Sequence, residues 1–221
     1  MDNVNTRSQR VEVAYNERER VFYSFIKRTC DIILSLIAIV LLSPIFLIVA
    51  LAIRFDSKGK VVFGHERIGQ GMKKFKIYKF RSMYENSQEI FNNFTDEQKK
   101  EYYINFKLDN DPRITRIGGF LRKTSLDELP QLINILKGDM SIVGPRPIVE
   151  KEIEKYGIYA ETVFSVLPGL TGYWQANGRS DTTYEERVQM DMYYIKNRSL
   201  WMDIKIILGT VTSVIKGKGA V

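Results

Sequence analysis

Two adjacent carboxylates, Asp127 and Glu128, are the residues of this sequence best suited to chemistry. Arg122 precedes them, and Arg146 follows between two prolines in the run GPRP. An ionised carboxylate can attack phosphorus, and carboxylate oxygens are the ligands that Mg²⁺ prefers. Two neighbouring carboxylates repel each other unless cations offset the repulsion. The pattern therefore predicts a phosphate-handling site in which Asp127 and Glu128 are also metal ligands.

The same carboxylates also fit a purely structural role. Ser125 and Glu128 have the spacing of a capping box, which satisfies the first backbone N–H groups of a helix. Pro130 argues against this register, because at the fifth helical position its ring would meet the Leu126 carbonyl. A helix that begins at Asp127 places the proline near the third position instead, where no N–H is missed. That start would also favour the ionised Asp127 through the helix dipole.

Three further basic side chains are candidate phosphate contacts. The prolines around Arg146 fix the backbone, and a guanidinium matches phosphate oxygens in bidentate fashion. In a predicted strand over 75–83, alternation puts Lys79 on the apolar face. Arg179 ends the loop YWQANGR, whose aromatic and amide groups suit a sugar or a base. The structural alternatives are a solvated turn, a snorkelling lysine and a loop that caps the core with a buried tryptophan.

Composition narrows the chemistry further. The chain has 221 residues, enough for one sizeable core or for a domain with a membrane element. Its formal net charge of +7 favours an anionic partner. Cys30 is the only cysteine and His65 the only histidine, which excludes an internal disulfide and argues against Ser-His or Cys-His catalysis and against zinc sites. Acid-base and nucleophilic chemistry therefore falls to carboxylates, Lys or Tyr.

An uncharged stretch of 22 residues, Ile32–Ile53, is the element expected to bring this site to a membrane. As a straight helix it would reach roughly 33 Å, enough to cross a bilayer. Ser43 and Pro44 lie at its midpoint, where the proline forces a kink and the serine hydroxyl can bond a freed carbonyl. Basic residues flank both ends, so both ends are expected in the cytoplasm. A re-entrant helix-break-helix satisfies these features, and a kinked transmembrane helix is the alternative.

The remaining pattern predicts a mostly helical α+β fold with a small β element. Helices and strands are expected over 84–107, 148–164, 183–197 and 200–216, and over 61–64 and 75–83, respectively. The last helix has one broad apolar face that begins at Trp201, which suits either an amphipathic interfacial helix or a core helix. Residues 1–20 are polar and predict a flexible cytoplasmic arm ahead of one catalytic domain over 21–221.

Four segments together resemble the monotopic phosphoglycosyl transferases, also called bacterial sugar transferases. They are KRTCDIILSLIAIVLLSPIF, KFRSM, LRKTSLDELPQLINILKGDMSIVGPRP and PGLTGYWQANGR. The resemblance runs from about Tyr23 to Lys216. It implies a re-entrant membrane helix over about 27–55, kinked at Ser43-Pro44, beside a cytoplasmic active site.

The resemblance also assigns roles residue by residue. Asp127 falls on the family's nucleophile, with Glu128 beside it and Mg²⁺ bound. Lys79 falls on the first lysine of the family's Lys-Phe-Arg/Lys element. Arg122 falls on the basic residue upstream of the carboxylate pair, and Arg146 on the arginine of the Pro-Arg-Pro turn. The role of Glu128 is left open between positioning the metal and orienting the acceptor.

The implied reaction transfers a sugar-1-phosphate from a UDP-sugar to polyprenyl (undecaprenyl) phosphate and releases UMP through a covalent Asp127 phosphosugar intermediate. It would start capsule, exopolysaccharide or other glycoconjugate synthesis at the cytoplasmic face of the bacterial cell membrane, with the protein inserted in one leaflet. Membrane lipids, downstream glycosyltransferases and a second copy of the chain are the other partners considered.

A function of another class competes with this one. A non-catalytic, basic membrane-interface scaffold or anionic-lipid-binding protein would explain the charge and the apolar segment. It gives no reason for the carboxylate pair beside Arg146. Nucleic acid is not expected as a partner, because the basic residues are scattered among apolar elements instead of gathered on one polar face.

Overall fold

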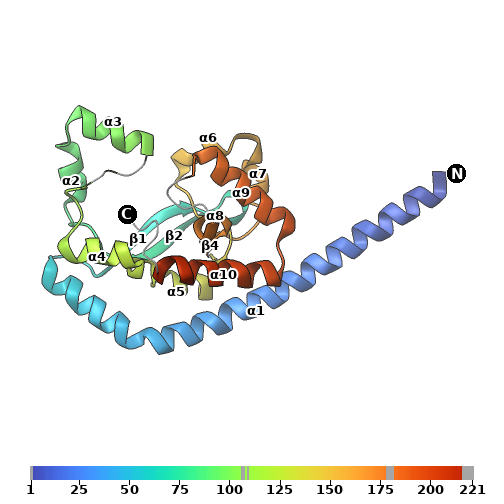
Figure 1. Cartoon of the computed structure of the whole chain (residues 1–221), viewed down its shortest axis with the longest axis horizontal. Coiled ribbons are helices and arrows are strands. Elements are labelled where there is room, and N and C mark those ends of the chain that lie inside the picture. Colours follow the sequence, from blue (N-terminus) through green and yellow to red (C-terminus); the bar gives the residue numbers. More distant parts are fainter. Residues whose placement is uncertain (1, 106–107, 109, 178–181, 216–221) are drawn as a thin grey trace.

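The protein is mostly helical, with two small sheets in the described residues and one long apolar helix near the N-terminus (Figure 1). The computed structural model describes residues 2–105, 108, 110–177 and 182–215, and of these the backbone alone at 2–20, 104–105 and 214–215. The predicted mostly helical α+β class is thereby confirmed.

Helix α1 (Asp2–Asp56) carries the apolar segment and bends along its length (Figure 1). Its residues Val21–Asp56 are long and apolar enough to cross a membrane, and few of them are buried against the protein. Pro44 lies inside the helix, and the Ser43 hydroxyl donates a hydrogen bond of 2.8 Å to the Val40 carbonyl. Because Pro44 has no N–H for that carbonyl, this bond confirms the predicted role of Ser43. The chain stays helical through Pro44, so the predicted break is a bend within one helix.

The backbone of α1 begins at Asp2. It therefore includes 2–20, for which the sequence predicts a flexible arm. The boundary near residue 20 between an arm and a catalytic domain stays a prediction.

Strands β1 (Val62–Ile68) and β2 (Lys74–Phe80) form an antiparallel hairpin. They confirm the two predicted strands, although β1 extends well beyond 61–64. It does so because each further residue finds a partner on β2, as far as the end of the hairpin. The register pairs Phe63 with Lys79, so the side chains of alternate residues on both strands share the face that carries Lys79.

A second, parallel pair joins β3 (Ser141–Val143) to β4 (Gly169–Thr171). The two backbones approach so closely that a Cβ on Gly169 would lie 2.1 Å from the nitrogen of Gly144. The Gly169 N–H donates to the Pro145 carbonyl at 2.8 Å. The glycines therefore tie the Pro-Arg-Pro turn to the loop before β4.

Helices of very different length surround these strands. They are α2 (Ser87–Asn92), α3 (Asp96–Asn105), α4 (Arg116–Thr124), α5 (Gln131–Lys137), α6 (Ile153–Tyr156), α7 (Ala160–Val163), α8 (Tyr173–Asn177), α9 (Tyr184–Asn197) and α10 (Leu200–Ile215). The single helix predicted over 148–164 is wrong, because Gly157 adopts φ +49° and separates α6 from α7. Helices α2 and α3 are separated near Thr95, where the side chains of Thr95 and Gln98 each accept from the other residue's backbone N–H.

The C-terminal half of α1 is part of the core that supports the segment with Asp127 and Glu128. Val49 and Ile53 are buried against Phe80 of β2 and Leu121 of α4. Leu126 and Leu129, which flank the carboxylate pair, pack on the same cluster. A second cluster of Ile77, Leu132, Ile135 and Met140 joins β2 to α5. The membrane-type helix and the carboxylate pair thus share one hydrophobic cluster.

Helix α10 has one side buried in the protein and one exposed apolar side. Ile206 is buried, whereas Trp201, Ile204, Leu208 and Val211 are exposed. The exposed set lies on a helix that runs close to α1 in Figure 1. The helix therefore packs on the core, as expected for a core helix. It also keeps an outward apolar face, as expected for an interfacial helix.

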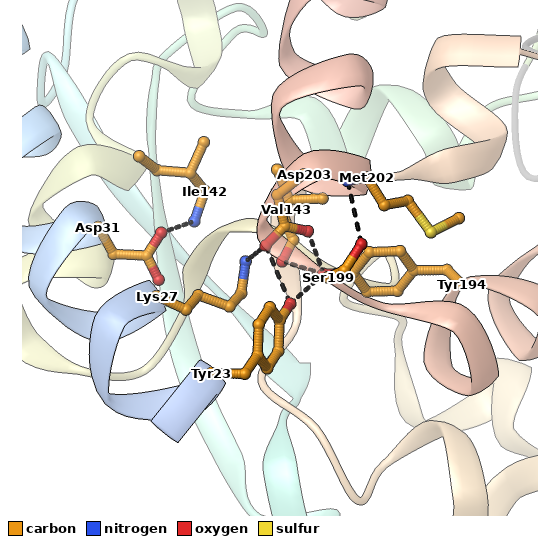
Figure 2. Close-up of polar contacts among 9 residues, drawn as sticks. All are labelled: Tyr23, Lys27, Asp31, Ile142, Val143, Tyr194, Ser199, Met202 and Asp203. Atoms are coloured by element: carbon orange, nitrogen blue, oxygen red, sulfur yellow. Dashed lines mark hydrogen bonds and ion pairs between the residues drawn. The ribbon is translucent and has the colours of Figure 1, made fainter. Parts of the chain in front are cut away.

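A polar cluster joins α1 to α10 and α9 (Figure 2). Lys27 lies 2.8 Å from the Asp203 carboxylate, and Tyr23 donates to the same oxygen at 2.9 Å. Tyr194 donates to the other oxygen at 2.8 Å. We call Tyr23, Lys27, Tyr194 and Asp203 the clasp. The clasp therefore pairs Lys27, one of the basic residues that flank the apolar segment, with a carboxylate of the protein.

The next turns of α1 make contacts with α5 and β3. The Arg28 guanidinium donates to the carbonyls of Ile135 and Leu136 at the end of α5. Asp31 accepts from the Ile142 N–H of β3 at 3.1 Å (Figure 2). Cations at a helix C-terminus satisfy carbonyls that have no partner within the helix. Both contacts fix α1 relative to α5 and β3, the two elements that follow the carboxylate pair in the chain.

Candidate active site

The carboxylate pair lies on a short 3-10 turn, Leu126–Glu128, between α4 and α5. Ser125 adopts a left-handed conformation (φ 58°) that ends α4, and its side chain makes no capping bond. Pro130 occupies the position just before α5, where its missing N–H has no consequence. Both predicted registers are therefore wrong: Ser125 is not a capping box residue, and the α-helix begins at Gln131 instead of Asp127.

Helix α4 delivers Arg122 to the pair. The helix starts at the Thr115 cap, whose hydroxyl accepts from the Gly118 N–H at 2.9 Å. A Cβ on Gly118 would lie 2.0 Å from the Ser82 carbonyl oxygen, so only glycine allows this approach. The Arg122 Nε then donates to the Ser82 hydroxyl at 2.9 Å. Gly118 and Gly119 lie inside α4 and do not interrupt it.

Asp127 is buried, and burial raises the pKa of its carboxyl to about 6. The positive charge of Lys79 opposes this rise, the negative charge of Glu128 adds to it, and Arg122 opposes it. The result is a carboxylate that is ionised at neutral pH but poorly stabilised by the protein. Such a group gains from binding to an electrophile or a cation.

Glu128 has the opposite balance. Burial acts to raise its pKa, but the charges of Lys79 and Arg146 and hydrogen bonds from Lys79 and Gln131 hold the pKa below its ordinary value. The Lys79 Nζ lies 2.6 Å from the Glu128 Oε1. The structure thus brings Lys79, Arg122, Asp127 and Glu128 together, as the sequence predicts.

A pocket opens beside Glu128, and its polar lining residues are Arg67, Lys79, Glu128, Gln131, Arg146 and Gln175. Arg146 is exposed on its Pro-Arg-Pro turn and lines this pocket. Sequence reasoning missed Arg67 and Gln131, whereas Gln175 is one of the amides of the predicted sugar- or base-binding loop. Only the strand register could have revealed Arg67, because it places that residue on the same face as Lys79.

The structure describes only part of the loop YWQANGR, which the sequence predicts to bind a sugar or a base. Trp174 is buried in α8, as the structural alternative expects. Its ring is flanked by Arg146 at 6.0 Å and Arg187 at 4.8 Å. Cations over an indole ring are attracted to its face. Trp174 therefore lies next to both arginines, closer to Arg187 than to Arg146. Arg179 lies outside the described residues.

The two carboxylates also fit the predicted Mg²⁺. Among the described residues, no group of three or more His, Cys, Asp or Glu side chains could hold a metal ion. Mg²⁺ usually binds through one or two carboxylates and completes its shell with water and substrate phosphates. Asp127 and Glu128 match such an ion, which would arrive with a phosphorylated substrate.

The sequence of the chain matches a family model and several known proteins. The family model described as "Bacterial sugar transferase" matches residues 22–217. A "UDP-galactose-lipid carrier transferase" of Erwinia amylovora is 49% identical over 199 residues, which are 89% of this chain and 42% of that protein. An "Undecaprenyl-phosphate galactose phosphotransferase" of Salmonella typhimurium is 46% identical over 199 residues, with the same two coverages of 89% and 42%.

A shorter relative matches along most of its length. The "Exopolysaccharide production protein ExoY" of Sinorhizobium fredii is 44% identical over 197 residues, which are 88% of this chain and 87% of that protein. The chain therefore spans less than half of the first two relatives and nearly all of the third.

Proposed function

The chain belongs to the bacterial sugar transferase family, and on this premise we propose that it transfers a sugar-1-phosphate from a UDP-sugar to polyprenyl phosphate. The names of its relatives support the two substrate classes and a role in exopolysaccharide production. The observation that carries the proposal is Asp127, a buried carboxylate with a raised pKa between Arg122 and the Lys79–Glu128 pair.

The reaction proceeds in two displacements. An Asp127 carboxylate oxygen attacks the phosphorus that bears the sugar, and the bond from that phosphorus to the oxygen of UMP breaks. A polyprenyl phosphate oxygen then attacks the same phosphorus, and the bond to Asp127 breaks to regenerate the carboxylate. The product is a polyprenyl-diphosphate-linked sugar.

The other residues act through charge. Arg122, Lys79 and Arg146 balance the negative charge that develops on the phosphate oxygens. Lys79 and Gln131 keep Glu128 ionised beside the nucleophile. A bound Mg²⁺ would supply Lewis-acid stabilisation of the phosphates, held by the two carboxylates.

The membrane arrangement is part of the proposal. We infer that α1 enters one leaflet from the cytoplasmic face and returns after its bend at Pro44. The outward apolar faces of α1 and α10 support this insertion, as does the packing of Leu126 and Leu129 on the α1 cluster. That packing keeps Asp127 beside the lipid surface from which polyprenyl phosphate would come.

Cysteine labelling tests the insertion. Cys30 is the single cysteine, so a Cys30→Ser background with one new cysteine near residue 20 or near residue 60 reports one position at a time. A membrane-impermeant thiol reagent should reach both positions from the cytoplasmic side. Labelling from opposite sides would contradict the re-entrant arrangement and favour a spanning helix.

A panel of UDP-sugars with UMP release as the readout tests the activity. The parent should release UMP from at least one member, and Asp127→Asn should lower that rate by about 10³-fold or more. Glu150→Gln, an exposed acid on the Lys74 ion pair, is the matched control and should leave the rate unchanged. Full turnover by Asp127→Asn would end the catalytic interpretation. A parent that releases no UMP from any sugar would favour the non-catalytic scaffold.

A further inference from the structure

Arg67 is a charged residue of the pocket that neither the sequence prediction nor the proposed reaction uses. It lies near the end of β1, and the hairpin register puts its side chain on the face that carries Lys79. Its side chain is only 14% exposed. It lines the pocket together with Lys79, Glu128 and Arg146. The guanidinium is thus nearly covered and faces the proposed site.

The Arg67 guanidinium lies beside the carboxylate of Glu152, which is itself held by a backbone hydrogen bond. The Glu152 Oε2 lies 3.7 Å from its NH1 atom and also accepts from the Val149 N–H at 2.9 Å. The neighbouring Ile68 N–H bonds the Ile148 carbonyl at 2.9 Å, so the two chain segments are joined there. The contact with Glu152 is longer than a charge-assisted hydrogen bond, which is about 2.7–2.9 Å. Glu152 can therefore orient the guanidinium without saturating it.

The pocket brings Arg67 and Arg146 toward each other. Burial lowers the pKa of Arg67 to about 10, and the charge of Arg146 contributes to the decrease. The covered guanidinium of Arg67 and the exposed guanidinium of Arg146 repel each other, and an anion that binds both removes the repulsion. Lys79, by contrast, is engaged by Glu128 at 2.6 Å. Arg67 and Arg146 are thus the cations of this pocket best suited to a ligand's charge.

We propose that Arg67 and Arg146 together bind the uridine-linked phosphate of the UDP-sugar, the phosphate that leaves as UMP, and that Glu152 is the positioning residue for Arg67. The inference rests on the proposed function. A UDP-sugar carries two adjacent phosphates, and the site offers two groups of cations. Arg122 interacts with Asp127 and serves the attacked phosphorus, whereas Arg67 interacts with Glu152, Arg146 and Glu128.

Calorimetric titration of the full chain in detergent with UMP and with uridine tests the assignment. Arg67→Gln should raise the dissociation constant for UMP by about tenfold to a hundredfold, as expected for the loss of charge-assisted phosphate bonds. The constant for uridine, which lacks the phosphate, should stay within about twofold. Lys76→Gln removes one positive charge from an exposed position of the same hairpin and should change neither constant.

Several outcomes overturn the assignment. One is a dissociation constant for UMP that is the same in Arg67→Gln as in the parent. Another is an equal loss of UMP and uridine binding, which indicates structural damage. If Arg67→Gln does not fold, Arg67→Lys keeps the charge but loses the fork, and it should still weaken UMP binding by about threefold or more. If Arg67→Lys binds UMP as tightly as the parent does, the proposal is overturned.

The positioning role of Glu152 has its own readout. Glu152→Gln should raise KM for the UDP-sugar by about fivefold and leave kcat within about twofold, because orientation of a binding group is lost but the chemistry is not. A fall in kcat at unchanged KM would contradict the role. If the parent neither binds UMP nor releases it from any UDP-sugar, the proposed function fails as well. If the parent does both and the Arg67 variants match it, the inference alone fails.

Discussion

Two lysine–carboxylate pairs of similar length lie in different parts of this molecule. In the clasp, Lys27 lies 2.8 Å from Asp203, and the side chains are 16% and 9% exposed. In the candidate active site, Lys79 lies 2.6 Å from Glu128, and the side chains are 18% and 30% exposed. Geometry and exposure alone do not distinguish a structural pair from a catalytic one.

The surroundings of the two pairs differ. Asp203 accepts from Lys27 and from the hydroxyls of Tyr23 and Tyr194, so its charge is met by donors within the protein (Figure 2). Glu128 lies beside a second carboxylate, Asp127, whose pKa is raised. A network completed within the protein stabilises the fold, whereas an incompletely balanced one indicates where a ligand binds.

Replacing each acid by its amide should separate the two regions most strongly. The pKa of about 6 for Asp127 lies above the ordinary 3.8, so the folded state binds this proton more tightly and loses stability as the pH rises through that window. Asp127→Asn should therefore raise the free energy of unfolding at pH 7 by up to about 3 kcal/mol in metal-free buffer. The gain should vanish below about pH 4.

Asp203→Asn should act in the opposite direction. It leaves Lys27 without its charged partner and should lower the free energy of unfolding by about 3–5 kcal/mol at pH 7. Denaturant unfolding in detergent at both pH values measures the two variants. Shifts of the same sign at pH 7 would remove the distinction between the regions.

Replacing the lysines should separate activity from stability. Lys79→Met removes a cation from the phosphate site and should lower UMP release by about 10²–10³-fold. Lys27→Met should destabilise the protein but leave turnover per folded molecule within about threefold. Rates at saturating UDP-sugar, corrected for the folded fraction, measure both. Equal losses of turnover would show that the clasp contributes to catalysis.

Arg28 connects the two regions and should have an intermediate effect. Arg28→Met removes the donors to two carbonyls at the end of α5 and should lower the free energy of unfolding by about 2 kcal/mol. Arg54→Met, at the exposed other end of α1, is the control and should change it little. Equal effects would indicate that only the basic charge beside the membrane matters.

The smallest effect is expected at the bend of α1. Ser43→Ala removes the hydrogen bond to a carbonyl that Pro44 cannot serve, and should cost about 1 kcal/mol. Thr29 makes a similar bond to the Phe25 carbonyl, which already has a helical N–H partner. Thr29→Ala should therefore cost less than about 0.5 kcal/mol. Identical unfolding measurements on the two variants would contradict the special role of Ser43.

The sequence predicts the parts of the site that follow from local chemistry. Asp127, Glu128 and the Pro-Arg-Pro turn are visible as residue types, and the bend at Pro44 follows from the missing N–H. Lys79 follows from strand alternation. The structure brings Lys79, Glu128 and Arg146 to one pocket, with Asp127 next to Glu128 in the chain.

Other features depend on contacts that no local pattern encodes. The clasp joins Tyr23 to Asp203, 180 positions away along the chain. Arg67 is revealed only by the hairpin register, and β3 and β4 have three residues each, too few for a recognisable period. The start of α5 is missed because the left-handed Ser125, a tertiary choice, ends α4 and leaves a 3-10 turn for the carboxylates.

Detection of a covalent intermediate on Asp127 tests the central claim most directly. The parent is incubated with an active UDP-sugar in the absence of polyprenyl phosphate, then digested and analysed by mass spectrometry. The account predicts a sugar-phosphate adduct on Asp127, formed with release of UMP and lost when polyprenyl phosphate is added. UMP release that requires polyprenyl phosphate and leaves no adduct, or an adduct on Glu128 instead, would contradict it.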